Sequence, residues 1–128
     1  MAELLTGIRV LYVEDDDDTR EVWEQSLSHL GATVTSVASA RAALDAVADA
    51  DIVLTDFLMA GEDGVWLLEQ VNHRPRPIPV IAITGFAEAH IPRLAHARFA
   101  RKLLKPVDAV DVARIVLEVL GRSPRAAG

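Results

Sequence analysis

The sequence contains no cysteine, so disulfide bonds and thiolate metal sites are excluded. Its 128 residues also contain no apolar run approaching the roughly 20 residues that a membrane-spanning helix needs. Residues 1–9 do not show the basic-then-apolar order of a signal peptide. The remaining composition, 51% hydrophobic and 25% charged, is that of an ordinary globular domain, so we expect a cytoplasmic protein with no membrane association.

Basic residues are also in short supply. Lysine and arginine number 13 against 19 aspartate and glutamate residues, which gives a formal net charge of −6 and argues against nucleic-acid binding by this domain. The acidic residues concentrate in the run from Glu14 to Asp18. The basic residues gather late in the chain, at Arg93, Arg98, Arg101, Lys102 and Lys105. Because the two groups can meet in the fold, net charge alone does not define the site.

Five short apolar segments alternate with five segments of helical spacing. The candidate strands are 8–13, 33–37, 52–55, 80–83 and 100–104, and the candidate helices are 19–30, 39–47, 65–71, 88–97 and 108–121. Strands joined by helices of this length predict a parallel sheet covered on both faces. The chain shows no repeat or internal linker, so we expect one domain over residues 1–122 and a disordered tail over 123–128.

Acidic residues, a threonine and a lysine stand at or just after the ends of four of these strands. Ligands bind beyond the carboxyl ends of the strands in an open parallel sheet, so these residues are expected to converge. Carboxylates in close quarters suit a hard cation such as Mg²⁺, and one of them could then attack a phosphoryl group. The residues are Glu14 and Asp15 after the first strand, Asp56 at the end of the third, Thr84 after the fourth, and Lys105 with Pro106 after the fifth.

Four segments resemble the motifs of response regulator receiver domains. Residues 10–16, V-L-Y-V-E-D-D, are similar to the family's acidic pair, and residues 51–64, D-I-V-L-T-D-F-L-M-A-G-E-D-G, to its phosphoacceptor motif. Residues 81–85, I-A-I-T-G, resemble the switch-threonine strand, and 103–106, L-L-K-P, the lysine-proline motif. The likeness runs from about residue 8 to 120 and implies a flavodoxin-like, doubly wound α/β sheet of strand order 2-1-3-4-5 with five helices.

The resemblance implies a metal site and a phosphoacceptor. Asp56 would accept the phosphoryl group. Mg²⁺, for which Mn²⁺ can substitute, would be held by Glu14, Asp15, Asp56 and the backbone carbonyl of Leu58.

The resemblance also implies a switch and its partners. Thr84 and Lys105 would bind the phosphoryl group, and the Lys105–Pro106 peptide would be cis. The donor would be a histidine kinase or a histidine phosphotransfer protein. The face made by the fourth helix, fifth strand and fifth helix would then change for a downstream partner, without substrate turnover.

The chain departs from the family pattern at several positions. Ala60 stands where proline is usual, so we expect a more mobile loop after Asp56. Lys102 replaces a common aromatic residue, so either the switch runs without an aromatic rotor, which we favour, or Phe99 or Phe86 substitutes. Leu58 and Phe86 offer no polar group to orient a water, which predicts slow autodephosphorylation.

Other acidic residues and the last helix have simpler interpretations. Asp16, Asp17 and Asp18 are expected to cap a helix, and Asp51 and Asp63 to serve in turns and caps. Ile115 and Val119 widen the apolar stripe of the last helix. Together with Lys102 they mark a candidate partner or homodimer surface, unless neighbouring helices cover them.

Two other function classes compete with a phosphorylation switch. An aspartate-nucleophile phosphohydrolase would want a second carboxylate two residues after Asp56, where Leu58 stands, and a cap for which the chain has no room. A degenerate receiver acting only as an interaction module is disfavoured by the complete set of site residues, although Lys102 and Ala60 leave it open.

Overall fold

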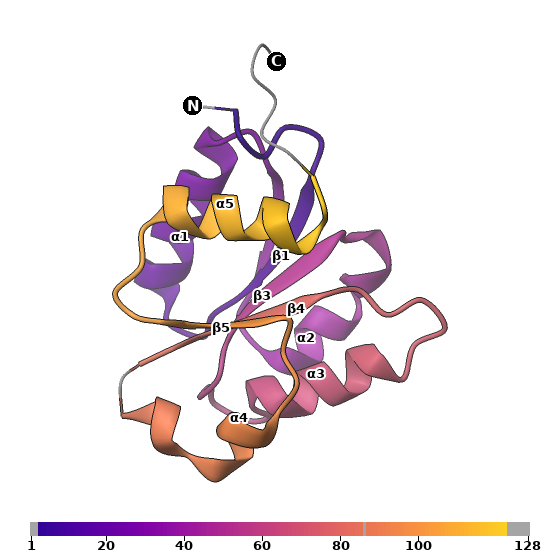
Figure 1. Ribbon diagram of the computed structural model, residues 1–128, viewed down its shortest axis with the longest axis vertical. Coiled ribbons are helices and arrows are strands. Elements are labelled where there is room, and N and C mark those ends of the chain that lie inside the picture. Colours follow the sequence, from indigo (N-terminus) through magenta and orange to yellow (C-terminus); the bar gives the residue numbers. More distant parts are fainter. Residues whose placement is uncertain (1–2, 86, 123–128) are drawn as a thin grey trace.

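The computed structural model describes residues 3–85 and 87–122. A five-stranded parallel sheet of order β2-β1-β3-β4-β5 crosses the domain, which confirms the predicted topology (Figure 1). The three central strands are buried along almost their whole length, and this explains why they read as continuous apolar runs. The strands are β1 (Arg9–Val13), β2 (Thr33–Val37), β3 (Ile52–Asp56), β4 (Val80–Thr84) and β5 (Arg101–Leu104).

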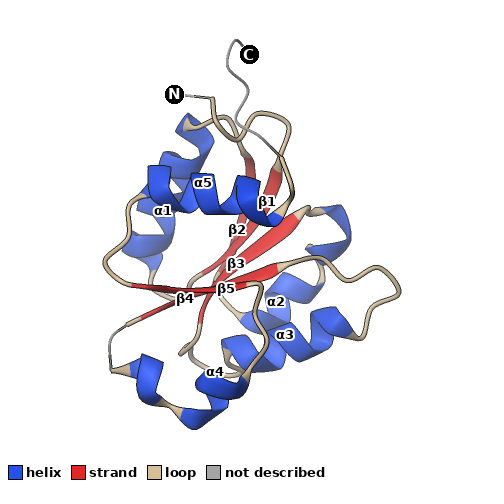
Figure 2. Cartoon of the chain, in the orientation of Figure 1, coloured by secondary structure: helices blue, strands red, loops and turns tan. Residues whose placement is uncertain are grey.

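Helices cover both faces of the sheet. One side carries α1 and α5 and the other carries α2, α3 and α4 (Figure 2). No helix in the described part of the chain is both long enough and apolar enough to cross a membrane. The helices are α1 (Asp17–His29), α2 (Ala40–Leu44), α3 (Gly64–Asn72), α4 (Pro92–His96) and α5 (Ala109–Val119).

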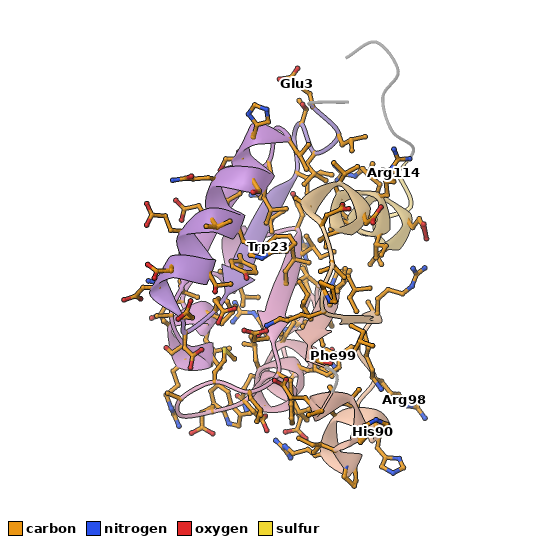
Figure 3. The ribbon with its side chains drawn as sticks, turned by 90° about the vertical axis from the view of Figure 1, so that its left-hand side faces the viewer. Glu3, Trp23, His90, Arg98, Phe99 and Arg114 are labelled. Atoms are coloured by element: carbon orange, nitrogen blue, oxygen red, sulfur yellow. The ribbon has the colours of Figure 1, made fainter. Side chains whose placement is uncertain are left out.

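Alternating residues of each central strand pack into separate cores. In β1, Tyr12 faces the core beneath α1 and α5, whereas Leu11 and Val13 face the core beneath α2 and α3. Trp23 of α1, which Figure 3 labels, lies against the ring of Tyr12. The two ring centroids are 6.1 Å apart. Because both faces of β1 and β3 are filled mostly with apolar side chains, the charged residues of these strands, Arg9 and Asp56, stand at the strand ends.

Side-chain caps start four of the helices. Asp16 accepts a hydrogen bond from the Thr19 N–H, and Ser39, Asp63 and Asp108 make the equivalent bond at α2, α3 and α5. The capping roles predicted for Asp16 and Asp63 are therefore confirmed. Each such cap stabilises its helix by about 1 kcal/mol.

Two predicted helices were too long. The one expected over 39–47 ends at Leu44 and gives way to a 3₁₀ turn, η1 (Val47–Asp49). The one expected over 88–97 is divided into a 3₁₀ turn, η2 (Glu88–His90), and α4. The division follows from Pro92, which begins α4 and holds the preceding Ile91 in an extended conformation. Phe86 and the predicted tail lie outside the described residues.

Candidate metal and phosphoryl site

Three carboxylates meet beyond the carboxyl ends of β1 and β3. One carboxylate oxygen from each of Glu14, Asp15 and Asp56 lies within 4.8 Å of the others. The register of β1 and β3 brings these acids together. Val13 pairs with Thr55, and the residues that follow them are Glu14 and Asp56. Glu14 and Asp56 are buried and Asp15 is exposed. The predicted acidic cluster therefore forms at the expected edge of the sheet.

Backbone amides orient the two acids that follow β1. The Asp16 N–H donates to Glu14 Oε2 at 3.1 Å, and the Ala60 N–H donates to Asp15 Oδ2 at 2.8 Å. Each bond engages one carboxylate oxygen and so restrains the orientation of its side chain. Arg20 adds a bond from Nη1 to the Glu14 carbonyl oxygen at 2.9 Å, which ties the first turn of α1 to the site.

The cluster is electrostatically crowded. Burial and, after it, the adjacent Asp56 together raise the pKa of Glu14 to about 8, because both favour the protonated form. A bound cation would relieve this repulsion, and a set of carboxylate oxygens is the ligand chemistry that Mg²⁺ prefers. The residues present therefore fit a divalent hard cation.

Lys105 supplies the positive charge next to the acids. Its Nζ lies 2.7 Å from Asp56 Oδ1, and its backbone N–H donates to the Thr84 carbonyl oxygen at 2.7 Å. Partial burial lowers the pKa of Lys105, but the hydrogen bond and charge of Asp56 outweigh it and the net shift is upward. The peptide bond to Pro106 is cis. Both the backbone and the side chain of Lys105 are thus fixed at the site.

Thr84 is buried at the end of β4, one strand away from Asp56. Its hydroxyl donates to the carbonyl oxygen of Gly85 at 3.2 Å, and no hydrogen bond joins it to Asp56 or Lys105 among the described contacts. The register places Asp56 opposite Ile83 and Thr84 opposite Leu104. Thr84 therefore stands beside the acids with its hydroxyl turned toward its own chain.

The loop between β3 and α3 is held close to the phosphoacceptor candidate. The Gly64 N–H donates to the Phe57 carbonyl oxygen at 2.8 Å, and a Cβ at Gly64 would lie only 2.6 Å from the Asp56 carbonyl oxygen. Only glycine fits at that approach. Leu58, in the same loop, projects an apolar side chain that is 53% exposed.

Lys102 ties β5 to α4. Its Nζ donates to the Ala95 carbonyl oxygen at 2.8 Å. Lys102 also lines a cavity of about 140 Å³, together with residues of β4, η2, α4 and β5, Thr84 among them. Phe99 is buried in the core with Leu94, whereas its neighbour Arg98 points away from the domain (Figure 3). None of the described residues that line this cavity is aromatic.

Two residues of α5 were predicted to widen its apolar stripe. Ile115 and Val119 are partly buried and pack against the core on the α5 side of the sheet. This packing favours the simpler interpretation, in which neighbouring elements cover them. A partner or dimer surface that includes both residues stays a prediction.

Three features of the site had no signal in the sequence. The Ala60 N–H is a backbone donor that only the loop geometry brings to Asp15. Arg20 reaches the Glu14 carbonyl from the next helix. Glu88 in η2 has a buried Oε2 with no hydrogen-bond partner in the described structure, and its charge acts on Lys105.

Comparisons with known proteins agree with this geometry. The sequence matches the family model of the response regulator receiver domain over residues 10–117. It is 33% identical over 110 residues to the DNA-binding transcriptional regulator NtrC of Escherichia coli K12, covering 84% of this chain and 24% of that protein. It is 35% identical over 120 residues to the transcriptional regulatory protein FixJ of Azorhizobium caulinodans, covering 91% of this chain and 57% of that protein.

Solved structures show the same fold. A CheY-like receiver domain from Methylobacillus flagellatus superposes with a TM-score of 0.75 at 25% identity, covering 90% of this chain and 98% of that one. A CheY-like receiver domain protein from Methanospirillum hungatei gives 0.77 at 27% identity, covering 91% and 94%.

An acidic cluster with an adjoining lysine, at the carboxyl edge of a flavodoxin-like parallel sheet, defines the class of α/β receiver domains. This chain belongs to the response regulator receiver domain family, whose members act in two-component systems. It spans about a quarter (24%) of the length of the first curated relatives that it matches.

Proposed function

We propose that this chain is the phosphoacceptor of a two-component system and that Asp56 receives the phosphoryl group. The observation that carries the proposal is the 2.7 Å contact between Lys105 Nζ and Asp56 Oδ1 beside the carboxylates of Glu14 and Asp15. An acceptor oxygen, a cation for the incoming phosphate and a metal-ligand set thus share one edge of the sheet. The phosphoryl donor is a phosphohistidine on a histidine kinase or a histidine phosphotransfer protein.

The chemistry is an in-line transfer from nitrogen to oxygen. A carboxylate oxygen of Asp56 forms the new P–O bond as the P–N bond of the donor breaks. The electron pair of that bond stays on the imidazole nitrogen, which takes up a proton. Glu14, Asp15, Asp56 and the Leu58 carbonyl would hold Mg²⁺, which supplies charge neutralisation when bound. Lys105 binds the phosphoryl oxygens as the second source of positive charge.

Thr84 links the chemistry to the surface. Its hydroxyl donates to the Gly85 carbonyl, so binding a phosphoryl oxygen requires it to give up that bond and turn inward. Thr84 shares a cavity with residues of α4 and β5, which Lys102 joins, so its movement reaches both elements. The face formed by α4, β5 and α5 changes in response and is recognised by a downstream partner. No aromatic rotor takes part in this version of the switch.

The residue two positions beyond Asp56 favours a switch over a substrate-turnover enzyme. Leu58 stands there and offers no carboxylate, so the acid-base group of an aspartate-dependent phosphohydrolase is missing. The chain therefore stores the phosphoryl group for signalling and turns over no separate substrate.

Binding of beryllofluoride, an acyl-phosphate mimic, tests the proposal. Wild-type protein is titrated with beryllofluoride in saturating Mg²⁺ and followed by NMR, with Asp56→Asn as the matched variant. We expect binding in wild type, none in Asp56→Asn, and shift changes that reach Thr84 and α5. Absence of beryllofluoride binding to the wild-type protein would overturn the assignment of Asp56 as phosphoacceptor and favour a pure interaction module.

A further inference from the structure

The carboxylate of Asp15 is held by a residue that lies 45 positions later in the chain. Ala60 N–H donates to Asp15 Oδ2 at 2.8 Å, across the gap between the loop after β1 and the loop after β3. Among the described contacts, no other hydrogen bond or ion pair engages the Asp15 side chain. The neighbouring Glu14 differs, because it is buried and its amide donor, Asp16, is two residues away.

The position of the bond leaves Asp15 able to bind a cation. One of its oxygens accepts the Ala60 N–H, and the carboxylate still contributes an oxygen within 4.8 Å of those of Glu14 and Asp56. Asp15 is exposed, so packing does not fix its rotamer. Without the Ala60 bond, a bound cation would have to immobilise this side chain, at an entropic cost.

The donor depends on the residue type at position 60. Every amino acid except proline carries a backbone N–H there, and the alanine side chain makes no contribution to the bond. The loop is also anchored at its far end, by the Gly64 N–H donating to the Phe57 carbonyl oxygen at 2.8 Å. The bond to Asp15 therefore supplies a second restraint on the segment that contains Leu58.

We propose that the Ala60 amide is a positioning group that presets Asp15 for a divalent cation and thereby sets the cation affinity of the site. The inference rests on the proposed function only in taking Glu14, Asp15 and Asp56 as the metal site. The same bond ties the loop after β3 to the metal ligand, so that the order of this loop depends on the Asp15 carboxylate.

Substitutions at position 60 separate the amide from the side chain. Ala60→Gly keeps the N–H and adds backbone freedom, whereas Ala60→Pro removes the N–H. Mg²⁺ titration followed by NMR should give an affinity for Ala60→Gly within about twofold of wild type. It should be about three- to tenfold weaker for Ala60→Pro, the range expected for immobilising one side chain. Thermal unfolding of both variants checks that they fold. Equal Mg²⁺ affinity for a folded Ala60→Pro and for Ala60→Gly would overturn the proposal.

A second readout needs no metal. Solvent exchange of the Ala60 amide, measured by NMR in Mg²⁺-free buffer, should be about two- to tenfold faster in Asp15→Ala than in wild type. Asp17→Ala is the matched control, because Asp17 pairs with Arg20 and does not touch Ala60, and its exchange should equal wild type. An unchanged rate in Asp15→Ala would overturn the proposal. Absence of Mg²⁺ binding in wild type, by contrast, would count against the metal site, while the exchange data would still test the bond.

Discussion

Lys102 Nζ donates a hydrogen bond to the Ala95 carbonyl oxygen at 2.8 Å, and this bond connects β5 to the last turn of α4. α4 is only five residues long, begins at Pro92 and follows a 3₁₀ turn, so it has few hydrogen bonds of its own. The face of α4, β5 and α5 that is expected to respond to phosphorylation is therefore stabilised by the hydrogen bond of Lys102. The family commonly has an aromatic residue at this position.

Lys102→Met should loosen α4 without unfolding the domain. Methionine keeps an apolar chain of similar length and removes the donor. We expect amide exchange in residues 92–96 to become about threefold faster, with a change of less than about 1 kcal/mol in the free energy of unfolding because the side chain is exposed. Hydrogen exchange measures the first and urea denaturation the second. The control is Arg101→Met, which breaks an ion pair with Glu118 of α5 and should leave exchange in α4 unchanged.

Mg²⁺ affinity should rise with pH through the titration of Glu14. Burial, with Asp56 beside it, raises the pKa of Glu14 to about 8, so a proton competes with the cation below that pH. We expect the affinity to climb by up to about tenfold per pH unit below pH 8 and to level off above it. Glu14→Gln should abolish the slope. An affinity that is flat between pH 6 and 8 in wild type would contradict the prediction.

The raised pKa of Glu14 also predicts how folding stability depends on pH when no metal is present. A carboxyl whose pKa is higher in the folded than in the unfolded protein binds more protons when folded. The contribution of this carboxyl to folding stability is therefore fully present below its ordinary pKa of 4.5. That contribution is lost as the pH rises toward 8. In Mg²⁺-free urea titrations, wild type should lose stability between pH 5 and pH 8 relative to Glu14→Gln. If wild type instead gained stability relative to Glu14→Gln over this pH range, the pKa of Glu14 would not be raised by folding.

Removing the charge of Lys105 should move two affinities in opposite directions. Lys105 lies 2.7 Å from Asp56 and lowers the negative potential at the metal site. Lys105→Met should tighten Mg²⁺ binding by about two- to fivefold, since the pair is partly exposed and screened. It should weaken beryllofluoride binding by about tenfold or more, because a charge-assisted contact to the anion is lost. Both affinities falling together would point to a structural defect, and Lys105→Arg tests for recovery of charge.

The sequence predicted the parallel sheet and the meeting of the acids for the same reason. Strands such as β3 are buried on both faces, so a polar residue at their end, Asp56, can only emerge at the edge. The predicted caps at Asp16 and Asp63 were also local, since each bonds an N–H three residues ahead. The resemblance to the receiver family supplied the strand order and the phosphoryl donor, which packing rules alone do not specify.

What the sequence did not predict depends on contacts between loops. The helix expected over residues 88–97 is interrupted because Pro92 excludes the helical conformation at Ile91, an effect stronger than the apolar spacing. The Ala60 amide leaves no mark in the sequence, because nearly any residue provides an N–H. Its importance appears only when the loop after β3 is placed next to Asp15.

Gly64 should be intolerant of even one added carbon. An alanine Cβ would lie 2.6 Å from the Asp56 carbonyl oxygen, a backbone atom that cannot rotate away. Although alanine favours helices, Gly64→Ala at the start of α3 should cost about 1–3 kcal/mol in the free energy of unfolding. Gly85→Ala is the control, because its Cβ would meet Glu88 at an ordinary 3.5 Å and should change stability by less than about 0.5 kcal/mol. A neutral Gly64→Ala in urea denaturation would show that the loop can shift.

The exposed side chain of Leu58 should set the lifetime of the acyl phosphate. It stands two residues after Asp56 and carries no group that could orient a water for attack on phosphorus. We expect the phosphorylated protein to persist for longer than about a minute in Mg²⁺ buffer, and Leu58→Asn to shorten that lifetime several-fold by offering an amide to the water. Leu104→Asn is the matched control, since Leu104 is also an exposed leucine (45%) but lies at the end of β5. Decay is followed by release of inorganic phosphate after phosphorylation with a small-molecule donor. Fast decay in wild type would mean that another group activates the water, and Glu88, whose buried oxygen lacks a partner in the described structure, would be the residue to replace next.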